Sequence, residues 1–126
     1  MTSASPDLVE LLPIGELARR AGVSPRLLRY YEAQGLLAAL RSLSGHRRYA
    51  PSAETTVRSI RLLLDAGVPT RLIRDLLDCV HDGSQIEPCA VPTLAAHLAG
   101  HDRRLARMAT TRAALQGLID AAMPNA

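Results

Sequence analysis

The amino-acid sequence predicts a mainly α-helical fold with one small β-hairpin and a long C-terminal helix. Apolar residues recur at helical spacing in several segments between residues 14 and 80. Residues 36–49 interrupt that spacing around the turn signal Ser44-Gly45. From Pro92 onward, apolar residues alternate steps of three and four, which is typical of a coiled coil. The 126 residues suffice for one compact domain with an appended element, but not for two independent cores.

The first pair of helices is predicted between residues 14 and 34. Apolar residues at i, i+3, i+4 and i+7 predict a short helix that begins near Ile14 and that Gly22 would end. After a three-residue turn, the Ser24 hydroxyl can cap a second helix. Pro25 suits the first position of that helix, because the missing N–H of proline is not needed there. The outward face of the second helix carries Arg26, Arg29 and Tyr30.

A hairpin and a second pair of helices follow. Residues 36–49 are too short and irregular for a helix, so we interpret them as two extended arms joined at Ser44-Gly45. Pro51 restarts the helical spacing, and this third helix is expected to end at residues 65–67. Thr70 is the expected cap of a fourth helix, whose apolar stripe reaches Val80. Residues 81–91 show no periodicity and are expected to form a hinge loop.

The long C-terminal helix is predicted over residues 92–122. Its apolar stripe needs a partner, so the pattern indicates a coiled coil that forms a homodimer. The residues assigned to this dimer contact are Leu94, Leu98, His101, Leu105, Met108, Leu115 and Ile119. Residues 1–12 are expected to be a flexible N-terminus, and residues 123–126 a tail.

Positive charge is concentrated in the first third of the chain. All fifteen basic residues are arginine, and residues 13–49 hold seven of them against only Glu16 and Glu32. This segment therefore has a net charge of +5, whereas the rest of the chain sums to −2. Insertion into a DNA major groove requires a particular order of elements. This order is a helix, a short turn, a capped helix with outward Arg and Tyr, and an arginine-rich hairpin. The sequence predicts a winged helix-turn-helix DNA-binding domain over residues 13–80.

The same segments resemble the MerR family of transcriptional regulators. The resemblance is carried by three stretches: IGELARRAGVSPRLLRYYEAQGLL, RSLSGHRRY and IRLLLDAGVPTRLIRDLL. The helix from residue 92 also resembles the antiparallel dimerisation coiled coil of that family. The resemblance implies a homodimer that binds double-stranded promoter DNA and distorts the promoter spacer in response to an effector, so that it acts on RNA polymerase indirectly. Activation and repression both stay open.

The resemblance also assigns DNA contacts residue by residue. The second helix would present Ser24, Arg26, Arg29 and Tyr30, with arginine able to read guanine and tyrosine able to meet a phosphate. The hairpin would hold phosphates through Arg47 and Arg48, with Tyr49 as a further donor and Arg41 on the facing arm. Either phosphate contact or simple solvation is open for Arg19, Arg20, Arg58, Arg61 and Arg71.

Two cysteines near the hinge leave the effector open. Cys79 is expected to be a small core residue, whereas the role of Cys89 is undecided. The resemblance extends to Cys89, because the heavy-metal sensors of the family also have a cysteine at this position. The further cysteines of those sensors have no counterpart here. The candidate metal ligands are Cys79, Cys89, His81 and His97. Alternatively, the two thiols could pair as a redox switch, with His81 nearby.

Other classes of protein fit less well. No apolar run approaches the ~20 residues needed to cross a bilayer, and the N-terminal segment is acidic where a secretory signal would be basic, so we expect a cytoplasmic protein without a membrane partner. No Ser-His-Asp, paired-carboxylate or phosphate-loop pattern appears, so we expect no enzyme activity. The alternative is a DNA-architectural or recombination-accessory winged-helix protein without an effector, which would bind dispersed or attachment sites rather than promoters.

Overall fold

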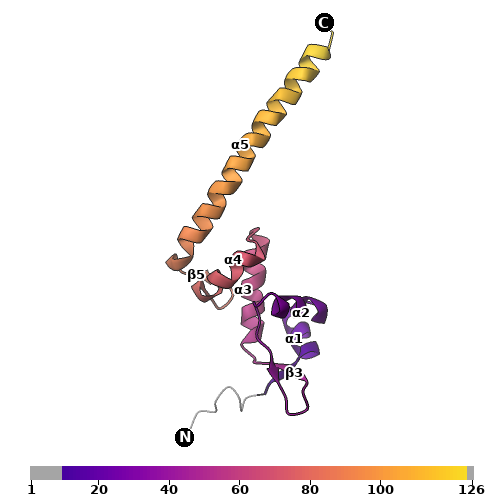
Figure 1. Cartoon of the computed structure of the whole chain (residues 1–126), viewed down its shortest axis with the longest axis vertical. Coiled ribbons are helices and arrows are strands. Elements are labelled where there is room, and N and C mark those ends of the chain that lie inside the picture. Colours follow the sequence, from indigo (N-terminus) through magenta and orange to yellow (C-terminus); the bar gives the residue numbers. More distant parts are fainter. Residues whose placement is uncertain (1–9, 125–126) are drawn as a thin grey trace. The chain divides into compact units, whose positions relative to one another are not determined.

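A computed structural model of the chain describes residues 10–124, which fall into two units (Figure 1). The first unit ends at Ala90, and the second begins at Val91. The first unit holds four short α-helices and two small antiparallel sheets, and the second is a single long helix. The predicted fold class, mainly α-helical with a small hairpin and a long C-terminal helix, is confirmed.

Helices α1 (Ile14–Ala21) and α2 (Pro25–Ala33) form where the sequence predicts them. Gly22 closes α1 in the left-handed conformation with φ of 70°, which a side chain at this position would disfavour. Ser24 caps α2 through its side chain, which accepts a hydrogen bond from the Leu27 amide at 3.1 Å. The turn between the helices is thus fixed at both of its ends by local chemistry.

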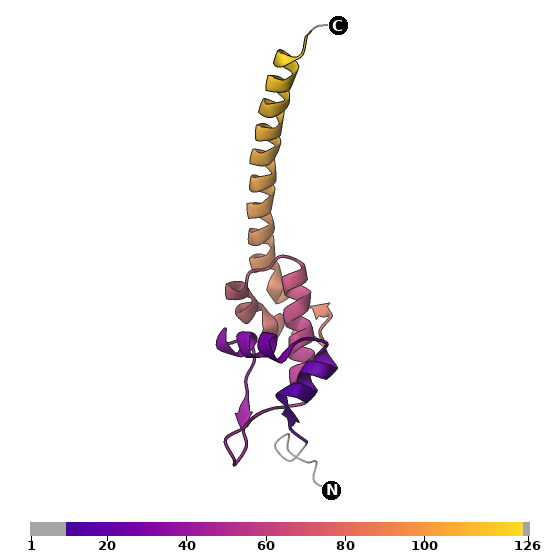
Figure 2. The ribbon, with the colours of Figure 1, turned by 90° about the vertical axis from the view of Figure 1, so that its right-hand side faces the viewer.

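The predicted hairpin belongs to a three-stranded antiparallel sheet. Strands β2 (Leu40–Arg41) and β3 (Arg47–Tyr49) pair with each other, and β1 (Leu12–Pro13) pairs with the other edge of β3. Figure 2 shows the loop between β2 and β3 projecting away from helices α1 and α2. The prediction that residues 1–12 are flexible is wrong for Leu12, which is buried opposite Tyr49; residues 1–9 lie outside the described part of the chain.

Helices α3 (Ala53–Asp65) and α4 (Thr70–Leu76) complete the core of the first unit. Thr70 is the first residue of α4 rather than its cap, because Pro69 holds the capping position without a side-chain bond. The core is mostly aliphatic, and it also contains Cys79 and two tyrosines. Its largest fully buried side chains are Tyr31, Tyr49, Leu17, Leu28, Ile60, Ile73, Leu76 and Val57.

The segment predicted as a hinge loop, residues 81–91, contains ordered structure instead. A 3-10 turn (Leu77–Cys79) leads into strands β4 (Val80–His81) and β5 (Gln85–Ile86), and a second 3-10 turn (Pro88–Ala90) follows. The β4–β5 hairpin turns at Asp82 and Gly83, which both have positive φ. A Cβ on Gly83 would lie 2.7 Å from the Cβ of Arg58, so the turn packs closely on α3. Strands of two residues are too short to produce a periodic pattern in the sequence, so they could not be predicted from it.

Helix α5 (Val91–Ala122) makes up almost all of the second unit that the structure describes. It begins one residue before the predicted boundary and contains no buried residue. None of the helices within residues 10–124 combines the length and apolar character needed to cross a membrane.

Candidate nucleic-acid interface

A concave basic surface joins helix α2 to the wing, by which we mean strands β2 and β3 and their loop. The depression has a volume of about 310 Å³. Four of its lining residues are arginines that the sequence predicts to contact DNA: Arg29, Arg41, Arg47 and Arg48. No carboxylate belongs to the lining, which also includes Pro13, Ile14, Gly45 and His46. Such a surface favours a phosphate, because arginine offers several N–H donors in a planar fork.

Helix α2 presents the predicted reading residues outward. Arg26, Arg29 and Tyr30 are all exposed, and Tyr30 leaves 47% of its surface accessible. Tyr31, one residue later, is buried because it falls on the opposite side of the helix. Ser24 serves first as the helix cap, and the hydrogen of its hydroxyl remains able to donate to an acceptor on DNA.

The wing arginines are held by bonds to backbone carbonyls and to one carboxylate. Arg41 donates to the carbonyl of Gly45 at 3.1 Å, and Arg48 donates to the carbonyl of Arg47 at 3.0 Å. Arg47 donates through Nε to Glu32 at 3.0 Å. Each bond uses part of a guanidinium and leaves other N–H groups for a phosphate. The wing therefore presents its charge from restrained side chains, which lowers the entropy lost on binding.

Tyr49 is not available to DNA, so its predicted role as a phosphate donor is wrong. Its side chain is fully buried, and its hydroxyl donates to Glu32 at 2.9 Å. Burial, followed by this bond to a carboxylate, raises the pKa of Tyr49 to about 12. Tyr49 instead contributes to the core beneath the wing.

Glu32 is a residue of this interface that sequence reasoning missed. Its two carboxylate oxygens accept from Tyr49 and from Arg47, which lie two residues apart on the same face of β3. Glu32 lies on α2, so these bonds fix the wing against the helix that carries Arg29. A signal was present in the sequence, because Glu32 is one of only two acids within residues 13–49.

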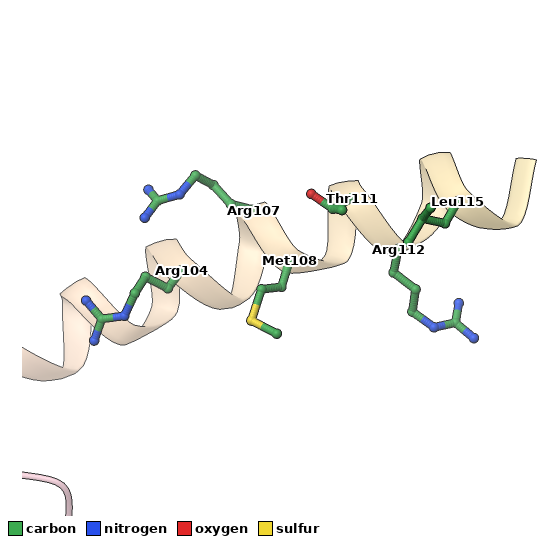
Figure 3. A pocket seen from close by; sticks show the side chains of 6 residues that line it. All are labelled: Arg104, Arg107, Met108, Thr111, Arg112 and Leu115. Atoms are coloured by element: carbon green, nitrogen blue, oxygen red, sulfur yellow. The ribbon is translucent and has the colours of Figure 1, made fainter. Parts of the chain in front are cut away.

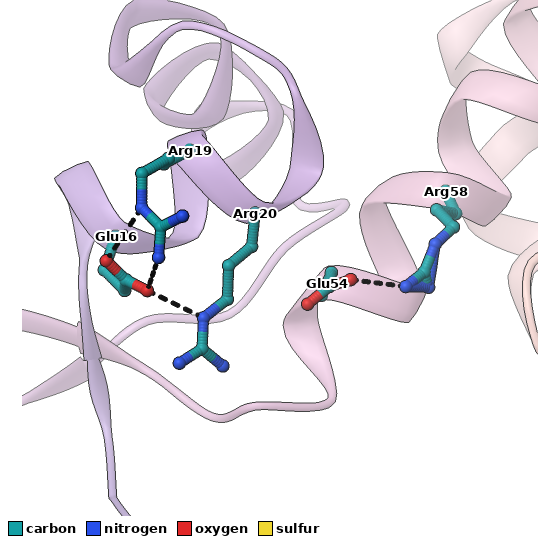
Figure 4. A network of polar contacts seen from close by, with 5 residues as sticks. All are labelled: Glu16, Arg19, Arg20, Glu54 and Arg58. Atoms are coloured by element: carbon teal, nitrogen blue, oxygen red, sulfur yellow. Dashed lines mark hydrogen bonds and ion pairs between the residues drawn. The ribbon is translucent and has the colours of Figure 1, made fainter.

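Three of the flanking arginines are paired with carboxylates (Figure 4). Glu16 accepts from Arg19 and from Arg20 on the same helix, and the bond from Arg19 is the main reason why the pKa of Glu16 is lowered. Arg58 pairs with Glu54 one turn earlier in α3. These pairs reduce the positive charge that the flanks offer. In the depression between α2 and the wing, Arg47 is paired with Glu32, whereas Arg29, Arg41 and Arg48 form no ion pair with a carboxylate within residues 10–124.

The candidate effector residues do not form one cluster. Cys79 and Cys89 are joined by a disulfide, with their Cα atoms 5.9 Å apart. Cys79 is buried, as a core residue would be, whereas Cys89 is exposed. His81 faces Glu87 at 2.8 Å, and His97 faces His101. Within residues 10–124, no group of three or more His, Cys, Asp or Glu is arranged to hold a metal ion.

Comparisons with known proteins agree with this geometry. Residues 12–79, more than half of the chain, match the family described as MerR HTH family regulatory protein. A heavy metal-dependent transcription regulator of Rhizobium meliloti is 34% identical over 94 residues, which are 74% of this chain and 64% of that protein. The chain thus spans less than two thirds of the length of that relative. An uncharacterised HTH-type transcriptional regulator of Pseudomonas aeruginosa is 32% identical over 108 residues, 85% of this chain and 82% of that protein.

Solved structures share the fold. The transcription regulator PbrR691 from Ralstonia metallidurans CH34, in complex with lead(II), has a TM-score of 0.73 at 22% identity and covers 91% of this chain and 90% of its own. HiNmlR, described as a MerR family regulator lacking the sensor domain and bound to promoter DNA, has a TM-score of 0.51 at 16% identity over 88% of this chain and 86% of its own. At these identities the likeness establishes the fold alone.

Proposed function

The chain belongs to the MerR HTH family of DNA-binding transcription regulators, and from this premise we propose that it binds promoter DNA as a homodimer and controls transcription according to the redox state of Cys79 and Cys89. The observation that carries the DNA-binding part is the depression between α2 and the wing, where four arginines converge without a carboxylate in the lining. We assign residues 13–80 to the DNA-binding domain and residues 92–122 to the dimer contact.

Helix α2 enters the major groove, and the wing lies along the backbone. Arg26 and Arg29 reach base edges from the exposed face of α2, while Tyr30 and the Ser24 hydroxyl donate to phosphates. Arg41, Arg47 and Arg48 hold phosphates from the wing. Glu32 holds α2 and the wing in a fixed relative position, because it lies on α2 and accepts hydrogen bonds from β3.

The homodimer forms through helix α5. Leu98, Leu105 and Leu115 each leave more than half of their surface exposed in the single chain, at 60%, 62% and 57%. Along the middle of the helix, Met108 and Arg112 project to the same side, with Leu115 one turn further on (Figure 3). Pairing two copies of this stripe removes apolar area from water, which favours association by roughly 25 cal/mol for each Å² buried. A dimer also places two reading heads on one site, as a promoter with two half-sites requires.

Transcription is controlled through the shape of the promoter. A dimer that bends and untwists an over-long spacer stores deformation energy in the DNA, and the two ends of the promoter move toward the geometry that RNA polymerase needs. The effector then has only to shift the balance between a distorted and an undistorted complex. Activation and repression are the two directions of the same shift.

The effector we favour is the thiol redox state. One relative is named as heavy metal-dependent, and the related PbrR691 structure is a lead(II) complex, but here the two cysteines are bonded to each other. A disulfide sulfur offers no thiolate to a metal ion. Oxidation by a peroxide joins the two sulfurs with loss of two protons and two electrons, and reduction of hydrogen peroxide releases two water molecules. A dithiol reverses the step and becomes a disulfide itself.

The position of the disulfide supports the proposal that its redox state affects neighbouring elements. Cys79 precedes β4 and Cys89 follows β5, so the bond closes the base of the β4–β5 hairpin. The turn of that hairpin packs on α3 at Arg58. Cys89 is exposed and open to an attacking thiolate, whereas Cys79 is buried. Reduction releases the base of the hairpin and the chain that enters α5. This change would shift the balance between the distorted and the undistorted promoter complex.

The proposal is tested by selecting bound DNA sequences from a random pool and transcribing the selected promoter in vitro. We expect a footprint centred on the promoter spacer and a transcript level that differs at least severalfold between peroxide-treated and dithiol-treated protein. The double variant Cys79→Ser/Cys89→Ser should give one transcript level under both treatments. Equal transcription by the oxidised and reduced wild-type protein would exclude the redox effector. Binding at dispersed sites with no effect on transcription would instead favour a DNA-architectural role.

A further inference from the structure

We propose that His97 and His101 form a bidentate site for a divalent transition-metal ion on helix α5. The two residues lie one helical turn apart, and their Nε2 atoms are 3.2 Å from each other. Their rings meet edge to face, with centroids 4.7 Å apart. Neutral imidazole is a preferred ligand of Zn²⁺, Ni²⁺ and Cu²⁺, so this ligand pair selects the imidazole-binding class of ions over Mg²⁺ or Ca²⁺.

The spacing of the two nitrogens matches that of two ligands on one ion. Zinc-to-histidine nitrogen distances are about 2.0–2.1 Å. Two nitrogens at that distance from one ion are roughly 2.9 Å apart when the angle between them is a right angle, and roughly 3.4 Å apart at the tetrahedral angle. The observed 3.2 Å falls between these values. Small rotations of the rings exchange their mutual hydrogen bond for two metal bonds, without moving the helix backbone.

The location of the pair leaves room for the remaining ligands. His101 lies on the apolar stripe of α5, and His97 is offset from it by about 40° around the helix. His101 is exposed, and His97 is half-buried. An ion on the pair would therefore sit at the edge of the stripe, where water can complete its coordination. Both ligands come from one chain, so neither a partner subunit nor the Cys79–Cys89 pair has to supply one of them.

A metal bridge across one turn also stabilises the helix that carries it. The ion binds the helical arrangement of the two imidazoles better than the unfolded chain, in which they are far apart on average, so binding adds to folding stability. The pair provides two protein ligands, so we expect weaker binding than at a closed four-ligand site. Two readouts follow: metal affinity, and a metal-dependent rise in the temperature at which the protein unfolds.

The test titrates Ni²⁺ into the full chain carrying Cys79→Ser and Cys89→Ser, so that no thiolate competes. We expect one ion per chain, and a loss of affinity of at least about tenfold in His97→Ala and in His101→Ala, because even second-shell changes cost that much. The wild-type histidine pair should also raise the unfolding temperature when Ni²⁺ is added, and the single variants should not. Cu²⁺ bound to the same protein should show nitrogen hyperfine splitting from two imidazoles in electron paramagnetic resonance.

A matched control moves one histidine without changing their number. In Ala96→His/His97→Ala, the two histidines lie five residues apart and point about 140° away from each other around the helix. This variant should bind Ni²⁺ as weakly as His97→Ala, whereas His81→Ala should bind as the parent does. Equal Ni²⁺ affinity in the parent and the shifted variant would overturn the proposal, as would full affinity after loss of either His97 or His101.

Discussion

At the scale of single residues, one carboxylate holds the wing against helix α2. Glu32 accepts from Arg47 and Tyr49, and these two bonds join α2 to β3. The helical phase of Arg29 and Tyr30 could be predicted from the sequence, because Leu28 and Tyr31 define the inward face. The burial of Tyr49 could not, because it depends on pairing with Leu12 in a two-residue strand that has no periodicity of its own.

The raised pKa of Tyr49 makes part of the stability depend on pH. A tyrosine whose pKa rises from its ordinary 10 to about 12 on folding stabilises the fold fully below pH 10, and this contribution is lost as the pH rises toward 12. Tyr49→Phe should therefore lower the free energy of unfolding by about 1–2 kcal/mol at pH 8, where a hydrogen bond to a carboxylate is lost. The deficit should shrink between pH 10 and 12.

Denaturant unfolding of both proteins at several pH values measures this difference. Absorbance titration should show that the last tyrosine to ionise in the wild type is missing from Tyr49→Phe. A deficit that stays constant up to pH 12 would contradict the assigned pKa of Tyr49.

Arginines on α2 and on the wing should differ in what they contribute to DNA binding. Arg29→Ala should cost about 1–3 kcal/mol at one base position and relax the base preference there. Arg47→Ala should weaken binding to all sequences alike and reduce the salt dependence by about one phosphate contact. Fluorescence anisotropy on specific and random duplexes over a range of salt concentrations measures both effects. Arg103→Ala on α5 is the charge-matched control, and an equal loss on both duplexes for Arg29→Ala would contradict its role.

At the scale of elements, the sequence predicts best those structures whose ends are set by local chemistry. Helices α1 and α2 follow from Gly22, the Ser24 cap and Pro25, which all act within one turn. The β4–β5 hairpin was missed because its strands have two residues each, and because its position depends on α3 and on the disulfide rather than on a pattern. The start of α4 differs from the prediction by one residue, because Pro69 occupies the capping position and Thr70 is the first helical residue.

The packing of the β4–β5 hairpin on α3 can be tested at Gly83. Gly83→Ala combines a positive φ of 73° with a Cβ that would lie 2.7 Å from the Cβ of Arg58. Gly45→Ala is the matched control, since Gly45 has a φ of 86° and nothing within 4 Å of an added Cβ. The control should lose about 1–2 kcal/mol of stability through backbone strain alone, and Gly83→Ala should lose at least about 1 kcal/mol more, because overpacking adds to the strain. Thermal and denaturant unfolding compare the two; equal losses would mean that the turn does not press on α3.

At the scale of the whole molecule, we propose that the first unit binds DNA and that the second pairs two chains. The first unit buries its apolar residues within one chain, whereas α5 buries none of its own. The heptad spacing predicted this helix over nearly its full length, because a repeated pattern of some thirty residues outweighs any local irregularity. One chain alone does not show which surface covers the apolar stripe of α5. The proposed binding to a promoter with two half-sites depends on that partner.

The proposed dimer contact is tested by placing the same charge on and off the apolar stripe. Leu105→Asp puts a carboxylate at a stripe position where the wild-type side chain is 62% exposed in the single chain, and burying that charge in a dimer without a partner costs several kcal/mol. Ala106→Asp adds the same charge one residue away, on the face that the stripe leaves to solvent. Sedimentation equilibrium should find Leu105→Asp monomeric at concentrations where the wild type and Ala106→Asp are dimeric. Because each head would then bind its half-site alone, Leu105→Asp should also protect the two halves of the promoter independently, at concentrations higher than the wild type needs. A dimer of unchanged stability in Leu105→Asp would show that the stripe of α5 is not the contact, whatever the heads bind.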